Sequence, residues 1–197
     1  MTARGAGARL ARCARWALVL SALAAAAVGS ATGVAFAAVL LAGSLVVSRF
    51  ARAPLDAAVA LFFLAHAAGT WVGYASIGAW GPLLHLLVPI LVAMVLALGL
   101  ADGRLRLPGR AVRRRRPGPS LLAATIGSLA IVVGWEVLER LMLLAPGVEI
   151  QTDRGDTIAD LRLGALGTAI GVLASLVVLR RERGIHLGSR ALDEPAP

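Results

Sequence analysis

The sequence predicts an all-α, polytopic transmembrane helical bundle of six spans with both termini in the cytoplasm. The chain of 197 residues is 58% hydrophobic and only 16% charged, with a mean hydropathy of +0.80. This composition is too apolar for a water-soluble domain of the same size. The apolar residues form separate runs of roughly helical span length, and arginines gather between alternate runs.

The chain divides into three parts by composition. We expect a basic cytoplasmic segment over residues 1–15, a helical bundle over 16–179 and a cytoplasmic tail over 180–197. The apolar runs within the bundle cover 16–29, 32–48, 57–73, 82–100, 120–144 and 157–179. A straight helix needs roughly 20 apolar residues to cross the hydrocarbon core, so the first run is short for a span.

The first two runs allow more than one interpretation. Between them, GSATG at 29–33 has the glycines and small hydroxyl residues of a tight turn, which favours two short spans. If the runs merge into one long helix, the bundle has five spans. A cleaved signal peptide is another interpretation, because basic residues precede the first run and small residues follow it. A signal-anchor helix explains the same pattern, since a second run follows immediately.

The arginines predict the orientation of the chain. With six spans and the N-terminus inside, the inner segments are 1–15, 48–54, 101–119 and 180–197. They hold all of the 20 arginines except Arg140, Arg154 and Arg162. This asymmetry matches the positive-inside rule for an even number of spans. We expect the Arg-rich loop 101–119 to lie in the cytoplasm and to meet anionic lipid headgroups.

The charge does not indicate a nucleic-acid partner. The formal net charge is +9 and the pI is about 11.6, values that can accompany nucleic-acid binding. The arginines are instead dispersed among the ends of apolar runs, without zinc-ligand, helix-turn-helix or stacking-aromatic patterns. We therefore expect the lipid bilayer to be the main partner.

Several apolar runs bring ionisable residues to one depth, the outer leaflet. Six of the eleven acidic residues fall between positions 136 and 160. A charge in the middle of a span costs about 2.5–3.5 kcal/mol, so these residues indicate a functional site. The candidates are His66 in the third run, His85 in the fourth, Glu136 and Glu139 in the fifth, and Asp156 and Asp160 at the start of the sixth.

Neighbouring carboxylates in a low dielectric need a cation, because they cannot all stay ionised without one. Arg140, Arg162, protons or a bound metal ion are the candidates for this role. Oxygen ligands suit Mg²⁺ or Ca²⁺, and participation of histidine favours Zn²⁺ or Mn²⁺. The pattern identifies no cofactor, and a divalent cation is the one candidate. A purely structural explanation is that Glu136 pairs with Arg140 at i and i+4, while Asp156 and Asp160 cap the last helix.

Small residues mark a packing face on the last run. Gly164, Gly167 and Gly171 share one side of the predicted helix, and the spacing Gly167-x-x-x-Gly171 lets a neighbouring helix approach closely. We expect this face to pack within the bundle, and a homo-oligomer is the other use of such a face.

Four segments resemble a known family in their order and spacing. They are LFFLAHAAGTWVGYASIG, LLHLLVPILVAMVLALGLAD, WEVLERL and GDTIADLRLGALGTAIG, between residues 57 and 179. Together they resemble the YjdF-like family of small bacterial multi-pass membrane proteins and, more distantly, the VanZ-like proteins. Two departures stand out: Gly81 replaces an aspartate that the family often has four residues before His85, and the chain has no asparagine. The resemblance implies a helical bundle in the bacterial cytoplasmic membrane and implies little about activity.

The pattern therefore favours a membrane protein whose outer-leaflet cluster binds a cation or a polar lipid or cell-envelope headgroup. Three alternatives stay open. One is a metal-assisted enzyme acting on an envelope lipid, with Glu136 or Asp160 as general base. The others are a small proton- or cation-coupled carrier and a purely structural membrane protein. No nucleophile-elbow serine or H-E-x-x-H motif occurs in the sequence, so no catalytic residue is assigned.

Overall fold

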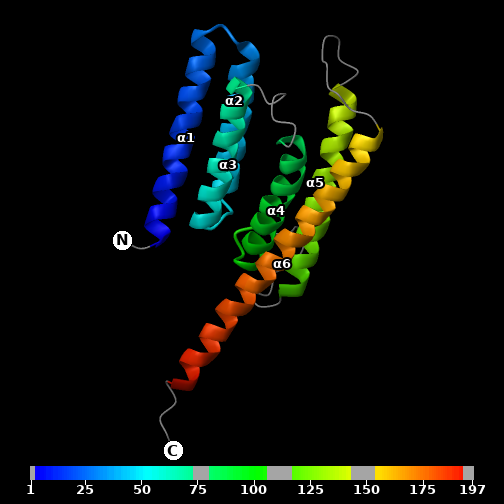
Figure 1. Cartoon of the computed structure of the whole chain (residues 1–197). Helices are drawn as coiled ribbons and strands as arrows, with labels where there is room; N and C mark the ends of the chain where they lie inside the picture. Colours follow the sequence, from blue (N-terminus) through cyan, green and yellow to red (C-terminus); the bar gives the residue numbers. More distant parts are fainter. Residues whose placement is uncertain (1–2, 73–79, 106–116, 143–153, 193–197) are drawn as a thin grey trace, which may run out of the picture. The chain divides into compact units, whose positions relative to one another are not determined.

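The computed structural model describes residues 3–72, 80–105, 117–142 and 154–192. Six helices occupy nearly all of these residues (Figure 1). They are α1 (Ala3–Ala27), α2 (Ala31–Ser48), α3 (Ala53–Val72), α4 (Trp80–Ala101), α5 (Pro117–Met142) and α6 (Arg154–Leu192). No strand occurs among the described residues, so the predicted all-α class is confirmed.

Four of these helices are long and apolar enough to cross a membrane. The candidate spans are Gly5–Ala27, Gly81–Ala101, Gly118–Leu138 and Thr157–Glu182. The apolar parts of α2 and α3, Gly33–Ser48 and Ala53–Ala68, are shorter. The 18 residues of α2 extend about 27 Å, slightly less than the ~30 Å of hydrocarbon in a typical bilayer.

The chain forms two compact units, Met1–Leu84 and His85–Pro197. The N-terminal unit contains α1, α2 and α3, which all pack against one another. The C-terminal unit contains α5, α6 and most of α4. The boundary falls near the start of α4, so that His85 belongs to the same unit as Glu136 and Asp160.

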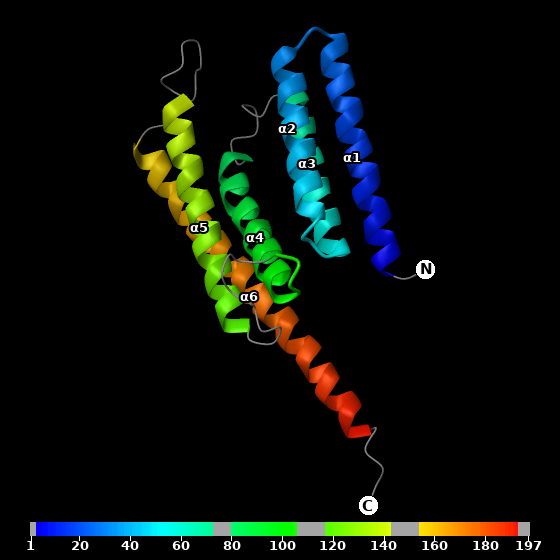
Figure 2. The ribbon, with the colours of Figure 1, turned by 180° about the vertical axis from the view of Figure 1, so that it is seen from behind.

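Small and aliphatic side chains fill the core of the N-terminal unit. Ala11 and Ala14 of α1 pack with Ala57 and Ala60 of α3, and a second cluster is centred on Leu18. Between α1 and α2 the chain turns at Gly29, whose φ of 73° favours glycine. The Ser30 side chain then caps α2 by accepting a hydrogen bond from the Gly33 N–H at 3.1 Å. The first two apolar runs are therefore separate helices (Figure 2).

The basic segment 1–15 is the first part of α1, which begins at Ala3 and continues without a break to Ala27. Arg9 and Arg12 are exposed, whereas Ala11 and Ala14 are buried against α3. Arginine and alanine are both good helix formers, which explains why the helix extends through a charged segment.

In the C-terminal unit, α5 and α6 lie side by side and run in opposite directions (Figure 2). The buried residues of α5 recur every fourth position and therefore form one stripe: Ser120, Ala124, Ser128, Val132 and Glu136. The corresponding stripe of α6 is Asp160, Gly164, Gly167, Thr168, Gly171 and Ser175. Each stripe thus has a carboxylate at the end where α5 finishes and α6 begins.

Gly164, Gly167 and Gly171 permit close contact of α6 with its neighbours. A Cβ on Gly164 would lie 2.5 Å from Val132 Cγ1 of α5. A Cβ on Gly171 would lie 2.5 Å from the Ile90 carbonyl oxygen of α4, and one on Gly167 would clash with the Leu86 carbonyl oxygen. These glycines therefore serve packing within the C-terminal unit, as the sequence predicts.

Candidate functional site

Three helices of the C-terminal unit bring one imidazole and two carboxylates together. His85 Nδ1 of α4 lies 3.5 Å from Glu136 Oε1 of α5, and His85 Nε2 lies 3.5 Å from Asp160 Oδ2 of α6. One ligand atom from each residue can be chosen so that all three lie within 4.8 Å of one another. We call these three residues the acidic triad.

The local sequence explains how each residue reaches this position. Glu136 and Asp160 belong to the buried stripes of α5 and α6, so the packing of these two helices turns both carboxylates inward. His85 stands four residues before Pro89, which lies inside α4. A proline has no N–H, so Pro89 cannot donate the usual helical hydrogen bond to the His85 carbonyl.

The triad lies near one end of the membrane-spanning segments. His85 is four residues after Gly81, Glu136 is two residues before Leu138, and Asp160 is three residues after Thr157. At 1.5 Å per residue, each is within about 6 Å of the end of its span. Trp135, next to Glu136, is 49% exposed, and tryptophan favours the membrane–water interface. The depth of the triad is therefore interfacial.

The triad is buried and carries more negative than positive charge. Glu136 is 6% exposed and Asp160 is 8% exposed. Separations of 3.5 Å exceed the 2.7–3.2 Å typical of N–H···O hydrogen bonds. A single imidazole, even when protonated, balances only one of two carboxylates. Burying two carboxylates close together is costly, and a nearby positive charge lowers that cost.

Arg140, a predicted neutralising residue, lies beside the triad at the end of α5. It is exposed, and its Nη2 donates a hydrogen bond to Thr157 Oγ1 of α6 at 2.7 Å. Arg162, the other candidate, is exposed on α6 two residues after Asp160. Residues two apart on a helix do not share a face, so Arg162 points away from the carboxylate of Asp160.

The remaining predicted site residues fall into two groups. The side chains of Glu139 and Asp156 lie outside the described residues, as does segment 106–116 of the Arg-rich loop. His66 belongs to the N-terminal unit and packs with aromatic rings there: its centroid lies 5.0 Å from that of Phe36 and 6.4 Å from that of Phe62. The inclusion of these residues in the site stays a prediction.

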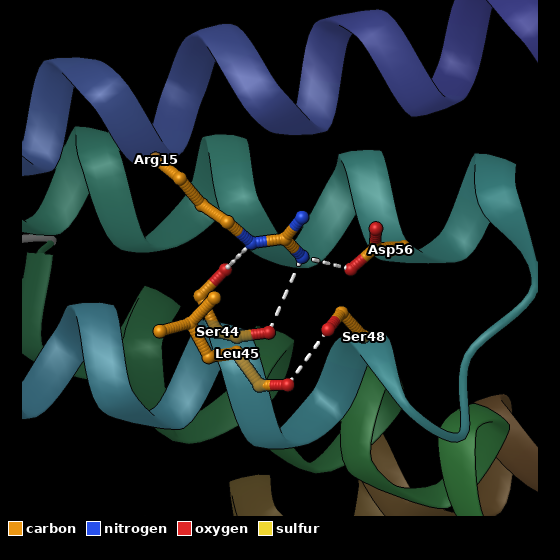
Figure 3. Close-up of polar contacts among 5 residues, drawn as sticks. All are labelled: Arg15, Ser44, Leu45, Ser48 and Asp56. Carbon is orange, nitrogen blue, oxygen red and sulfur yellow. Dashed lines mark hydrogen bonds and ion pairs between the residues drawn. The ribbon is translucent and has the colours of Figure 1, made fainter.

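The N-terminal unit contains a charged cluster that the sequence analysis did not anticipate (Figure 3). Arg15 Nε donates to Ser44 Oγ at 2.9 Å, and Arg15 Nη2 donates to the Ser44 carbonyl at 3.2 Å and pairs with Asp56. A signal was present, since Asp56 is the only acidic residue before Asp102. The distribution of arginines along the chain indicates topology and contains no information about the partner of Arg15.

A neutral polar contact lies farther along the helices of the C-terminal unit. Ser128 Oγ donates to the Pro89 carbonyl at 3.3 Å and lies 2.9 Å from Thr168 Oγ1. These hydroxyl groups are eight residues from Glu136 and Asp160, or about 12 Å along each helix. They tie α4, α5 and α6 together below the triad.

Comparison with known proteins identifies a family, but no individual relative. No curated protein and no solved structure matches this chain. A family model described as "Predicted membrane protein (DUF2238)" matches residues 8–181. The more distant VanZ-like resemblance stays a prediction. Because the match covers most of the chain, including all three triad residues, the protein belongs to the DUF2238 family of predicted membrane proteins, the YjdF-like family.

Proposed function

We propose that the protein binds a divalent cation through His85, Glu136 and Asp160, at the extracytoplasmic end of a helical bundle in the bacterial cytoplasmic membrane. The observation that carries the proposal is the convergence of three potential ligand atoms within 4.8 Å from three different helices. The arginine distribution supports the orientation, because it assigns the opposite ends of α4, α5 and α6 to the cytoplasm.

Charge balance supports a divalent ion. With a neutral imidazole, the two carboxylates carry two negative charges, which one divalent cation cancels. In a site of low dielectric, an ion and its ligands are least costly to bury when their total charge is zero.

The ligand types favour Zn²⁺ or Mn²⁺ over Mg²⁺ or Ca²⁺. Imidazole is a common ligand of Zn²⁺ and Mn²⁺ sites, whereas Mg²⁺ and Ca²⁺ prefer oxygen ligands. Bonds of about 2.0–2.1 Å in tetrahedral geometry separate neighbouring ligand atoms by roughly 3.4 Å. The two 3.5 Å contacts involve different ring nitrogens of His85, so an ion would use one of them, and the chosen ligand atoms, now within 4.8 Å of one another, would move closer on binding.

The test is a metal titration of the purified full chain in detergent. After treatment with a chelator, the thermal midpoint is measured with Zn²⁺, Mn²⁺, Mg²⁺ or Ca²⁺, and the ion content per chain is determined by elemental analysis. We expect Zn²⁺ or Mn²⁺ to raise the midpoint with a stoichiometry near one. At one hundred times the dissociation constant, the stabilisation equals about 2.7 kcal/mol.

Substitutions with matched controls locate the binding site. His85→Gln and Asp160→Asn are expected to abolish the response to the ion. Asp102→Asn, directly after the other end of α4, is the control and should retain it. A flat response of the wild type to all four ions would refute metal binding and leave the contacts of His85 with Glu136 and Asp160 as structural ones.

A further inference from the structure

We infer that the bound cation and Arg140 together hold the phosphate of a lipid headgroup. This inference rests on the proposed cation site and names the ligand that the site takes. It comes from a second feature of the C-terminal unit, the contact of Arg140 with Thr157 at 2.7 Å. This contact joins α5 to α6 one helical turn beyond the two carboxylates.

Arg140 and Thr157 lie on the same side of the helix pair as the triad, as their spacing along each helix shows. Arg140 is four residues after Glu136 on α5, and Thr157 is three residues before Asp160 on α6. Residues three or four apart share a helix face, and they are separated by about 4.5–6 Å along the axis. Because α5 and α6 run in opposite directions, both displacements lead toward the same membrane face. Arg140 therefore lies on the triad's side of the helix pair, closer to the headgroups.

The chemistry of this arrangement selects a phosphate. Three protein ligands leave at least one coordination position of a Zn²⁺ or Mn²⁺ ion for an outside ligand. Phosphate oxygens bind such ions well, and the guanidinium group recognises phosphate through paired N–H donors. A phosphate near Arg140 and the ion would contact positive charge on both sides. The Thr157 hydroxyl orients the guanidinium while Arg140 stays exposed.

The depth of the site favours a lipid as the source of this phosphate. Arg140 lies just beyond the candidate span Gly118–Leu138, and Trp135 exposes half of its surface at the same end of α5. Lipid phosphates lie at this level of a bilayer, so a headgroup reaches the site without leaving the membrane.

The test measures lipid retention by native mass spectrometry. The full-length protein is extracted from vesicles that contain equal amounts of phosphatidic acid and phosphatidylglycerol in phosphatidylcholine, with Mn²⁺ or with chelator. Both anionic lipids attract Mn²⁺ to the surface, but only phosphatidic acid has a terminal phosphate. We expect phosphatidic acid to be retained about tenfold over phosphatidylglycerol with Mn²⁺, and this preference to disappear with chelator.

Variants of Arg140 separate the role of its guanidinium group from that of the bound metal ion. Arg140→Gln should lose the lipid preference while retaining the thermal response to Mn²⁺, and Arg140→Lys should recover only part of the preference. Arg162→Gln, an exposed arginine in the same unit, should behave like the wild type. Equal loss in Arg140→Gln and Arg162→Gln would overturn the inference, as would equal retention of both lipids by the wild type with Mn²⁺.

A titration with inorganic phosphate distinguishes a free phosphate from a lipid phosphate as the ligand. Inorganic phosphate is added to the Mn²⁺-loaded protein in neutral detergent. Saturation at submillimolar concentration, together with no lipid preference, would mean that the site binds free phosphate and would overturn the lipid source. Failure of the cation site is recognised separately, because the wild type would then show no Mn²⁺ response even without lipid. A positive Mn²⁺ response without lipid preference refutes this inference alone.

Discussion

The two units of the molecule bury charged groups in different ways. In the N-terminal unit, Arg15 and Asp56 form an ion pair whose charges cancel, with side chains 14% and 13% exposed. In the C-terminal unit, Glu136 and Asp160 face the single imidazole of His85. The first cluster joins one basic and one acidic side chain, whereas the second places two carboxylates beside one imidazole. This difference separates a contact that stabilises the fold from one that suits a ligand.

The hydrogen bonds support the same distinction. Arg15 also donates to the hydroxyl and the carbonyl of Ser44, so that α1, α2 and α3 are joined through one guanidinium group (Figure 3). In the triad, both contacts of His85 are 3.5 Å long. Charge-assisted hydrogen bonds typify a settled ion pair, whereas the separations in the triad exceed the usual length of a hydrogen bond.

Breaking the N-terminal ion pair should have the largest effect on stability. Arg15→Met leaves Asp56 buried without this partner, and we expect a loss of about 3 kcal/mol in the free energy of unfolding. The double variant Arg15→Met/Asp56→Leu should lose much less, because it removes both charges. Denaturant titration in detergent measures both values. Arg12→Met, on an exposed position of α1, is the control and should change stability little.

Equal losses in the single and double variants would contradict this interpretation of the Arg15 cluster. Such a result would mean that the hydrophobic packing around Arg15 matters more than its charge.

The glycine contacts of the C-terminal unit should have an intermediate effect. In Gly171→Ala, the new Cβ would lie 2.5 Å from the Ile90 carbonyl oxygen and 2.9 Å from Ala93 Cβ, so α4 and α6 must separate. We expect a loss of about 1–3 kcal/mol, measured by the same titration. Gly134→Ala is the control, because a Cβ at Gly134 meets nothing within 4 Å. That substitution should be neutral or stabilise α5 by up to about 1 kcal/mol. A Gly171→Ala variant as stable as Gly134→Ala would refute the close packing.

The smallest expected effect is that of Glu136→Gln, which should raise stability rather than lower it when no metal ion is present. In chelator, Glu136→Gln removes one of two neighbouring negative charges, and we expect the protein to gain up to about 1 kcal/mol of stability. With Mn²⁺ present, the same variant should be less stable than the wild type because it loses a ligand. Thermal midpoints with chelator and with Mn²⁺ measure this reversal. A loss of stability in both conditions would indicate that the residues of the triad stabilise one another without a metal ion, as Arg15 and Asp56 do.

The sequence predicted the helices better than their contacts. The apolar runs and the GSATG turn indicated six helices, and the structure contains six among its described residues. Their hydropathy also indicated membrane spans, and within the described residues four helices are long and apolar enough to cross a membrane, while the apolar parts of α2 and α3 are shorter. The length of α1 was less apparent, because arginines at its start conceal a helix that begins at Ala3.

The candidate site was predicted in part because its depth can be read along each run. His85, Glu136 and Asp160 were assigned to one membrane face from their positions alone, and the structure brings them together. The link between Arg140 and Thr157 was not predicted, since a threonine at a helix start has many uses. Arg15 was counted as a cytoplasmic charge, yet it is paired with Asp56 from a helix 41 residues away.

The sequence by itself determined the membrane class, the helical runs and the depth of each polar residue, because these follow from local composition and from a constant rise per residue. Only the tertiary structure decided which polar groups meet. That outcome depends on how each helix is rotated about its axis, which is set by the contacts of several helices at once. In the C-terminal unit, the glycines of α6 bring the backbone of α4 close, and the four-residue stripe of α5 turns Glu136 inward. Hydropathy along one helix contains no information about this rotation relative to a partner, which is why His85, Glu136 and Asp160 form a triad only in three dimensions.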